Sequence, residues 1–256
     1  MKRLLYPATL VLASVTGLYA QSASSAAPPN RAFGYVALNQ DVFFGFYPTM
    51  QAVYKFNDKV GATAYGTLWT TPSFGTGGGG GLWTEVGAGV YLSAFDGKFS
   101  ITPQIGTLNG KLLSNGNFPM ALEGIVPNFT ANVNTSRFES EVYAGFYTAL
   151  RTGKIRNASG TALVDAPSQN NFTHWWANGG VKLGQPFSVG LHYESLGSRP
   201  SVGASSGVYK WVGPYVQGNF TQNFSVRFSV GANVQDRPTL DGNDSFYKVT
   251  ATYRFQ

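Results

Sequence analysis

The sequence predicts an all-β fold: a transmembrane, antiparallel, up-and-down β-barrel, most simply of twelve strands. Three observations lead to this expectation. Apolar and polar residues alternate with period two, short and long connections alternate along the chain, and only 12% of the 256 residues are charged. An ordinary soluble domain carries roughly 25% charged residues. A soluble β-sandwich would show the same alternation, but the low charge and the loop rhythm favour the barrel.

The last segment, 245–255, shows the alternation most clearly. One face is apolar and rich in aromatic residues, and the other is cationic and hydroxylated. The first face holds Tyr247, Val249, Ala251, Tyr253 and Phe255, and the second holds Lys248, Thr250, Thr252 and Arg254. The same pattern recurs in 86–94, 98–105, 187–194 and 224–234. These segments are therefore expected to be strands with one apolar face each.

Turn signals divide the chain from residue 33 onwards into twelve expected strands. Short connections fall near 57–58, 96–97, 133–135, 185–186 and 221–223, and longer polar stretches at 39–45, 70–81, 108–118, 151–172, 197–207 and 236–244. The strands expected between them are 33–38, 46–56, 59–69, 82–95, 98–107, 119–131, 136–150, 173–184, 187–196, 208–220, 224–235 and 245–255. Strands of about 11 residues rise about 36 Å, which a tilt near 40° reduces to the apolar height of an outer membrane. Ten or fourteen strands remain alternatives, and the alternation leaves the phase of 33–56 and 119–131 open.

The first twenty residues have the pattern of a secretory signal peptide. Lys2 and Arg3 precede an uncharged apolar stretch, and a small polar segment follows it. Cleavage after Ala20 is expected, with alternatives after Ala23, Ala26 and Ala27. Residues 21–32 would then form a flexible N-terminal segment, and 33–256 the barrel.

Together these features resemble a bacterial outer-membrane β-barrel of the porin type, over residues 33–256. Such barrels usually end on Phe as an assembly signal, whereas here Gln256 follows Phe255. The resemblance implies an outer-membrane location, contact with outer-membrane lipid, and recognition of the last strand by the outer-membrane assembly machinery. It indicates neither a specific family nor an oligomeric state.

The polar face of the strands is expected to line the lumen and to set its ion selectivity. Its ionisable members are Lys55, Glu85, Lys98, Glu139, Glu141, Lys182, His192, Glu194, Arg227, Lys248 and Arg254. Basic residues outnumber acidic ones, which predicts a weak preference for anions. If these groups paired with one another instead, the lumen would be filled.

Aromatic residues near the strand ends are expected to lie at the two membrane interfaces. These are Tyr54, Phe56, Phe99, Trp175, Phe187, Phe224, Tyr253 and Phe255. Trp83 and Trp176 fit the same interfacial position.

Several functions are disfavoured by the composition. No Cys is present, which excludes disulfides and thiolate chemistry, and the scattered basic residues form no nucleic-acid footprint. His174 and His192 are the only histidines, and neither has the Ser two residues away that an outer-membrane lipid hydrolase would use. We therefore expect no catalytic residues, no metal site and no cofactor. The expected function is a porin-like passive channel for small solutes or ions, with a non-conducting barrel acting through its surface loops in adhesion or envelope integrity as the alternative.

Overall fold

The structure is a computed structural model that describes residues 31–69, 83–184, 186–235 and 244–256. The expected signal peptide, residues 21–30 of the expected flexible segment, and most of the expected connections at 70–81 and 236–244 lie outside the described residues. Residues 31–256 form one compact unit. The first strand begins at Ala32, so the last residue of the expected N-terminal segment belongs to the barrel.

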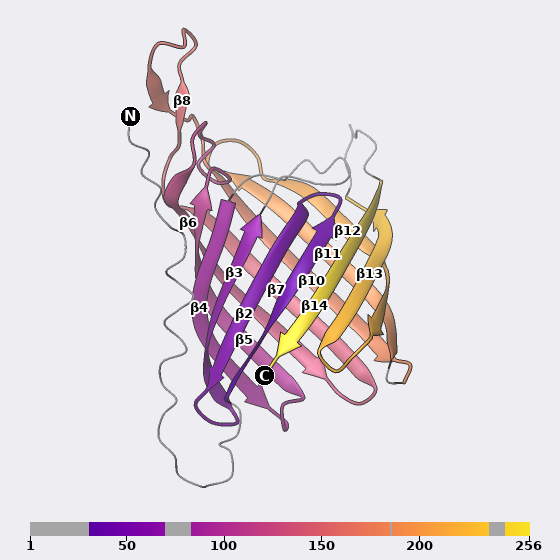
Figure 1. The fold of residues 1–256 in the computed structure, drawn as a ribbon. Helices are drawn as coiled ribbons and strands as arrows, with labels where there is room; N and C mark the ends of the chain where they lie inside the picture. Colours follow the sequence, from indigo (N-terminus) through magenta and orange to yellow (C-terminus); the bar gives the residue numbers. More distant parts are fainter. Residues whose placement is uncertain (1–30, 70–82, 185, 236–243) are drawn as a thin grey trace, which may run out of the picture. The chain divides into compact units, whose positions relative to one another are not determined.

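Twelve antiparallel strands close into a barrel, as the alternation predicts (Figure 1). The strands are β1 (Ala32–Asp41), β2 (Gly45–Lys55), β3 (Val60–Trp69), β4 (Trp83–Ala94), β5 (Phe99–Gly110), β6 (Met120–Asn134), β7 (Phe138–Ala149), β10 (Asn170–Lys182), β11 (Phe187–Pro200), β12 (Ser206–Asn219), β13 (Phe224–Asn233) and β14 (Ser245–Phe255). The barrel closes where β1 pairs with β14, with Gly34 opposite Phe255. None of the described residues forms a helix long and apolar enough to cross a membrane.

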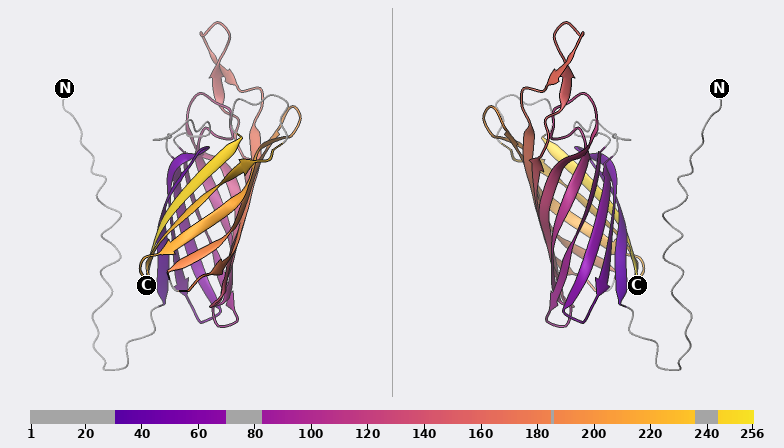
Figure 2. Two further views of the ribbon diagram at one scale, coloured as in Figure 1. Left: turned by 90° about the vertical axis from the view of Figure 1, so that its right-hand side faces the viewer. Right: turned by 90° about the vertical axis from the view of Figure 1, so that its left-hand side faces the viewer.

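The two ends of the barrel differ in their connections (Figure 2). One end carries the short turns and the C-terminus. Beyond the other end stands a small hairpin of β8 (Lys154–Arg156) and β9 (Leu163–Asp165), with an ion pair of 2.7 Å between Lys154 and Asp165. The connection expected to be long and polar at 39–45 is instead a short turn, 42–44, at this second end.

The register gives every strand an inward and an outward face, and it assigns the phase that the sequence left open. On β1 the inward residues include Tyr35 and Asn39, on β2 Gln51, and on β6 Asn128, because these side chains line the interior. Most outward positions are apolar and exposed, up to 67% at Leu191. The barrel is therefore polar inside and apolar outside.

A glycine on β11 makes room for an aromatic ring that lies across the inner wall. A Cβ at Gly190 would stand 2.2 Å from the carbonyl oxygen of Gly179 and 2.6 Å from Cε1 of Tyr215. At Gly179 on β10, by contrast, an added Cβ meets nothing within 4 Å. Gly190 therefore allows the Tyr215 ring to reach Glu139. The Tyr215 hydroxyl donates a hydrogen bond of 2.8 Å to Oε1 of Glu139.

We expect Gly190→Ala to lower the free energy of unfolding by about 1–3 kcal/mol, because the new methyl group forces backbone and ring apart. Gly179→Ala is the matched control, with an expected effect near zero. The measurement is urea unfolding in lipid vesicles, followed by tryptophan fluorescence. Equal effects of the two substitutions would contradict the conclusion that Gly190 is needed to leave room for the Tyr215 ring.

Candidate functional site

A cavity of about 1160 Å³ occupies the lumen on the side of the short turns. All twelve barrel strands contribute to its wall, and it reaches the short turns at Gly97, Ser136 and Thr221. At its other end it stops at a layer of aromatic side chains that includes Tyr47, Trp69 and Tyr147. The lumen is thus wide and polar over one part of its length and packed over the rest.

Most of the ionisable residues predicted for the lumen lie on this cavity wall. They are Glu85, Lys98, Glu139, Glu141, Lys182, His192, Arg227, Lys248 and Arg254. The other two lie beside it: the ammonium group of Lys55 stands 5.2 Å from the ring centre of Phe33, and Glu194 is fully buried beneath Lys248. Five basic and three acidic side chains line the cavity, a formal charge of +2.

Each carboxylate on the cavity wall accepts a hydrogen bond from an aromatic side chain. The donors are the Tyr65 hydroxyl to Glu85 (2.7 Å), the Tyr215 hydroxyl to Glu139 (2.8 Å) and the Trp176 indole to Glu141 (2.9 Å). Arg227 also lies 3.8 Å from Glu139 and donates to Gln217 at 3.0 Å. These bonds hold the negative charges against the wall.

The packed layer at the end of the cavity, which we call the aromatic septum, is built from side chains that are at most 7% exposed. It consists of Phe44, Tyr47, Trp69, Trp83, Leu108, Leu113, Val126, Tyr147, Leu196, Tyr209, Trp211 and Phe246. Two stacks of rings stand on different parts of the wall. One runs from Tyr47 through Trp69 to Trp83, at 4.7 and 5.5 Å, and the other from Tyr209 through Trp211 to Phe246, at 4.0 and 5.1 Å.

Phe44 connects these two stacks across the lumen. Its ring centre lies 4.6 Å from that of Trp69 on β3, 5.6 Å from His174 on β10 and 6.5 Å from Tyr209 on β12. In the barrel order, β3 and β10 are separated by four strands on one side and six on the other, so they stand almost opposite each other. The turn 42–44 therefore folds inward, and the described residues close the lumen at this level.

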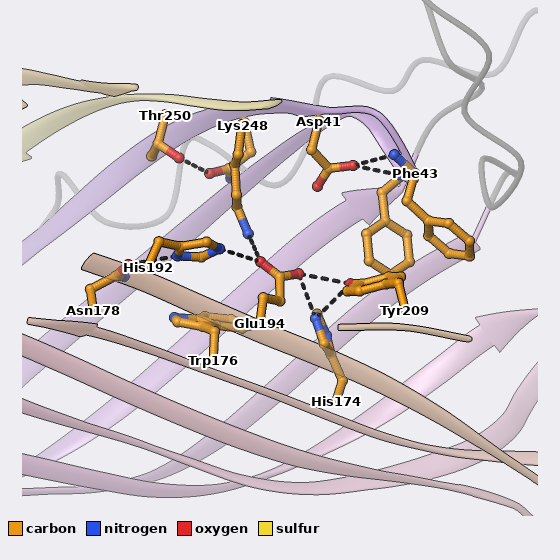
Figure 3. Close-up of polar contacts among 12 residues, drawn as sticks. Asp41, Phe43, His174, Trp176, Asn178, His192, Glu194, Tyr209, Lys248 and Thr250 are labelled. Atoms are coloured by element: carbon orange, nitrogen blue, oxygen red, sulfur yellow. Dashed lines mark hydrogen bonds and ion pairs between the residues drawn. The ribbon is translucent and has the colours of Figure 1, made fainter. Parts of the chain in front are cut away.

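Asp41 holds this turn in place from a fully buried position. Its Oδ1 atom accepts hydrogen bonds from the backbone N–H groups of Phe43 (2.9 Å) and Phe44 (2.6 Å), as Figure 3 shows for Phe43. The arrangement is a side-chain cap on a turn, in which the carboxylate satisfies two backbone donors.

Below the septum, Glu194 is the centre of a buried polar cluster (Figure 3). Its Oε1 atom accepts from His174 Nε2 and from the Tyr209 hydroxyl, both at 2.8 Å. Its Oε2 atom accepts from Lys248 Nζ at 2.6 Å and lies 3.2 Å from His192 Nε2. The cluster joins β10, β11, β12 and β14, so it ties the septum to one half of the wall.

On the far side of the septum lies a second, apolar cavity of about 70 Å³. Its wall includes Phe43, Phe44, Leu112 and Phe172. Glu123, fully buried, holds the connection above it by accepting the N–H groups of Leu113 (2.5 Å) and Ser114 (2.7 Å). The septum thus separates a polar cavity from an apolar one.

The aromatic residues predicted for the membrane interfaces lie on the outside of the barrel. Seven of them are at least 36% exposed, namely Tyr54, Phe56, Trp175, Phe187, Phe224, Tyr253 and Phe255, while Phe99 is half-buried. The same expectation was wrong for Trp83 and Trp176, which point inward: Trp83 belongs to the septum, and Trp176 stacks on Tyr143 at 3.9 Å. Thr84 and Trp175, which stand next to them in the chain, are exposed, as the period of two requires.

Sequence reasoning missed Asp41, Phe43 and Phe44, because 39–45 read as a polar connection. Two consecutive Phe residues that begin two positions after an Asp were the available signal, since an Asp that caps a turn can hold apolar residues inward. Both histidines belong to the Glu194 cluster. Among the described residues, no group of three or more His, Asp or Glu side chains could hold a metal ion.

Comparisons with solved structures find porins and related outer-membrane proteins at very low sequence identity. A NanC porin structure is 9% identical, with a TM-score of 0.46, and the match covers 86% of this chain and 98% of that one. The KdgM porin is 10% identical, with a TM-score of 0.46 and coverage of 87% and 99%. A loop L8 deletion mutant of OmpT, an outer membrane protein of Vibrio cholerae, is 11% identical, with a TM-score of 0.42 and coverage of 88% and 98%.

No curated protein matches the sequence. One family model does match, over residues 1–255, and it covers the whole barrel. The chain belongs to the family of unknown function DUF6733.

Proposed function

We propose that the protein is a porin-like channel of the bacterial outer membrane, which passes small solutes or ions passively and is closed in this conformation by the aromatic septum. The observation that carries the proposal is the polar cavity of about 1160 Å³. A barrel that only displayed loops would gain nothing from a lumen this wide, and pairing its interior side chains would fill the space.

The exterior supports an outer-membrane location. Outward side chains on all twelve strands are mostly apolar, and exposed aromatic residues, such as Tyr54, Phe187 and Tyr253, gather near the short turns. A closed barrel satisfies its backbone hydrogen bonds internally, which a membrane requires. In such barrels the short turns face the periplasm, so the cavity would open to the periplasm and the septum would lie towards the cell surface.

Movement of the turn 42–44 is the step that would open the channel. Among the described aromatic rings, only that of Phe44 contacts both stacks, and Phe44 sits on a short turn rather than on a strand. Displacing it breaks no strand pairing of the barrel. Solutes would then pass down their gradient, and the charged wall would bias which ions enter.

The septum itself favours a second candidate function, a non-conducting barrel that acts through its surface. Its twelve residues are at most 7% exposed, as buried as the residues of a protein core. The two candidates differ in whether current ever crosses the barrel.

Planar-bilayer recording of the refolded mature chain separates the two candidates. For the channel we expect discrete current steps separated by long closed intervals. A folded sample that stays silent, both as wild type and with Phe44 removed, would support the non-conducting barrel. Folding is checked beforehand by the shift of the folded band on heating in a denaturing gel.

We expect the charges on the cavity wall to set ion preference. Arg227→Glu together with Arg254→Glu changes the wall from +2 to −2 and should move the reversal potential in a salt gradient from anion towards cation preference. Lys248 is left intact because it neutralises the buried Glu194. The reversal potential is measured on channels that also carry Phe44→Ala, which opens them. The control is Lys59→Glu with Arg137→Glu, since both residues lie on exposed turns. An unchanged reversal potential would show that these arginines do not border the conduction path.

A further inference from the structure

The outward face of the barrel carries two charged side chains, and they stand on adjacent strands. The twelve barrel strands contain thirteen Asp, Glu, Lys and Arg residues, of which only Arg199 on β11 and Lys210 on β12 point outward. The other eleven are buried, line the cavity or border it: Asp41, Lys55, Glu85, Glu123, Glu139, Glu141, Lys182, Glu194, Arg227, Lys248 and Arg254. Both outward charges are positive.

These two cations stand beside an aromatic pair. Trp175 on β10, Ser195 on β11 and Lys210 on β12 are direct partners in one row across three strands. The ring of Trp175 stacks on that of Tyr193 at 4.5 Å, just below this row. Arg199 lies four residues beyond Ser195, towards the long connections, so its Cα is about 14 Å from that of Lys210.

Neither Arg199 nor Lys210 forms an ion pair with any of the described residues. Arg199 Nη2 donates to the hydroxyl of Thr173 at 2.6 Å, which orients the guanidinium along the surface. Lys210 is exposed, and its ammonium group forms an ion pair with none of the described residues. Within the part of the chain that the structure describes, the two outward positive charges therefore have no acidic partner.

Arg199, Lys210 and the Trp175–Tyr193 pair lie at the height where the apolar outer surface of the barrel is expected to end. Ser195 is eight residues from Phe187, an exposed aromatic residue at the short-turn end. Eight residues on a strand tilted by about 40° rise about 20 Å, and the apolar band of an outer-membrane barrel is about 25 Å tall. Aromatic residues mark the interface, and phosphate groups of the lipids begin just beyond it.

We propose that Arg199, Lys210, Ser195 and Trp175 form a binding site for the phosphorylated head of an outer-leaflet lipid. The cations would bracket the phosphate, the Ser195 hydroxyl would donate a hydrogen bond to it, and the Trp175–Tyr193 pair would pack against the upper acyl chain. Arg and Lys are the side chains that recognise phosphate. The site rests on the outer-membrane location proposed above, but not on conduction.

Native mass spectrometry of the full mature chain in detergent micelles tests the site, with diphosphorylated lipid A as the probe. Arg199→Ala with Lys210→Ala should weaken binding at least tenfold, and Arg199→Lys with Lys210→Arg should restore most of it. Lys59→Ala with Arg137→Ala is the matched control, because it removes the same charge from exposed turns at the other end. We expect it to bind like wild type, and lipid A stripped of its phosphates to bind weakly to every variant.

Two outcomes would overturn the site: equal losses in the two double-alanine variants, which would indicate general charge attraction, or equal binding of lipid with and without phosphate. Planar-bilayer current is recorded on the same variants. A barrel that carries no current but binds the phosphorylated lipid would contradict the proposed channel and support the lipid site. A barrel that conducts but does not bind the lipid would support the channel and contradict the lipid site.

Discussion

Replacing Phe44 by alanine is expected to raise the open-channel conductance several-fold and to abolish the long closed intervals. The Phe44 ring contacts the Trp69 ring on β3 and the Tyr209 ring on β12, and it is 6% exposed. Its removal leaves a gap in the middle of the lumen that connects the polar cavity with the small apolar one, since both reach Trp69 and His174. Single-channel recording in planar bilayers measures the change.

The control for this experiment is Phe228→Ala, which removes the same ring from the outward face of β13, where Phe228 is 47% exposed. Its conductance should equal that of wild type. Deleting a buried Phe costs about 3–5 kcal/mol of stability, so the folded gel band must be present before any current is interpreted. A folded Phe44→Ala barrel with the wild-type current would place the barrier elsewhere.

A second substitution opens the same turn without touching the ring. Asp41→Ala removes the acceptor of the Phe43 and Phe44 N–H groups, and should increase conductance in the same direction but less. Asp41→Asn keeps an oxygen acceptor in the same place and should remain close to wild type. If Asp41→Ala kept the closed intervals unchanged, the cap would not be what holds the turn inward.

The architecture could be predicted because most strands repeat one simple rule. Period-two alternation determines which side chains point outward and which point inward, so parity alone predicts that residues such as Glu139 and Arg254 point inward. The twelve-strand count followed from turn signals at nearly regular spacing. These features depend only on local sequence.

The septum could not be predicted because it depends on contacts between distant strands. Parity places Trp69 and Trp83 inward, but nothing local says that their rings stack and meet a Phe carried by the turn 42–44. Trp83 and Trp176 were assigned to the interface on residue type, although one residue along the strand reverses the face. Parity points the Glu194 side chain inward, but its complete burial follows from Tyr209 and Lys248, 15 and 54 residues away.

The ion pair of Glu194 leads to the second large effect. Lys248→Met should lower the free energy of unfolding by about 3–5 kcal/mol, because it leaves a fully buried carboxylate without its cation. Lys98→Met is the matched control: Lys98 also lines the cavity, but it is exposed and forms no ion pair within the described part of the chain. Its expected effect is below about 0.5 kcal/mol. Urea unfolding in lipid vesicles measures both.

The double variant Lys248→Met with Glu194→Gln tests the reason for that loss. Once the carboxylate is neutral, no buried charge remains to be compensated, and the glutamine oxygen still accepts from His174 and Tyr209. We therefore expect the double variant to be more stable than Lys248→Met alone, a non-additivity that a double-mutant cycle measures directly. A double variant less stable than Lys248→Met would mean that the lysine acts through its packing over Trp176, 5.2 Å away, and not through its charge.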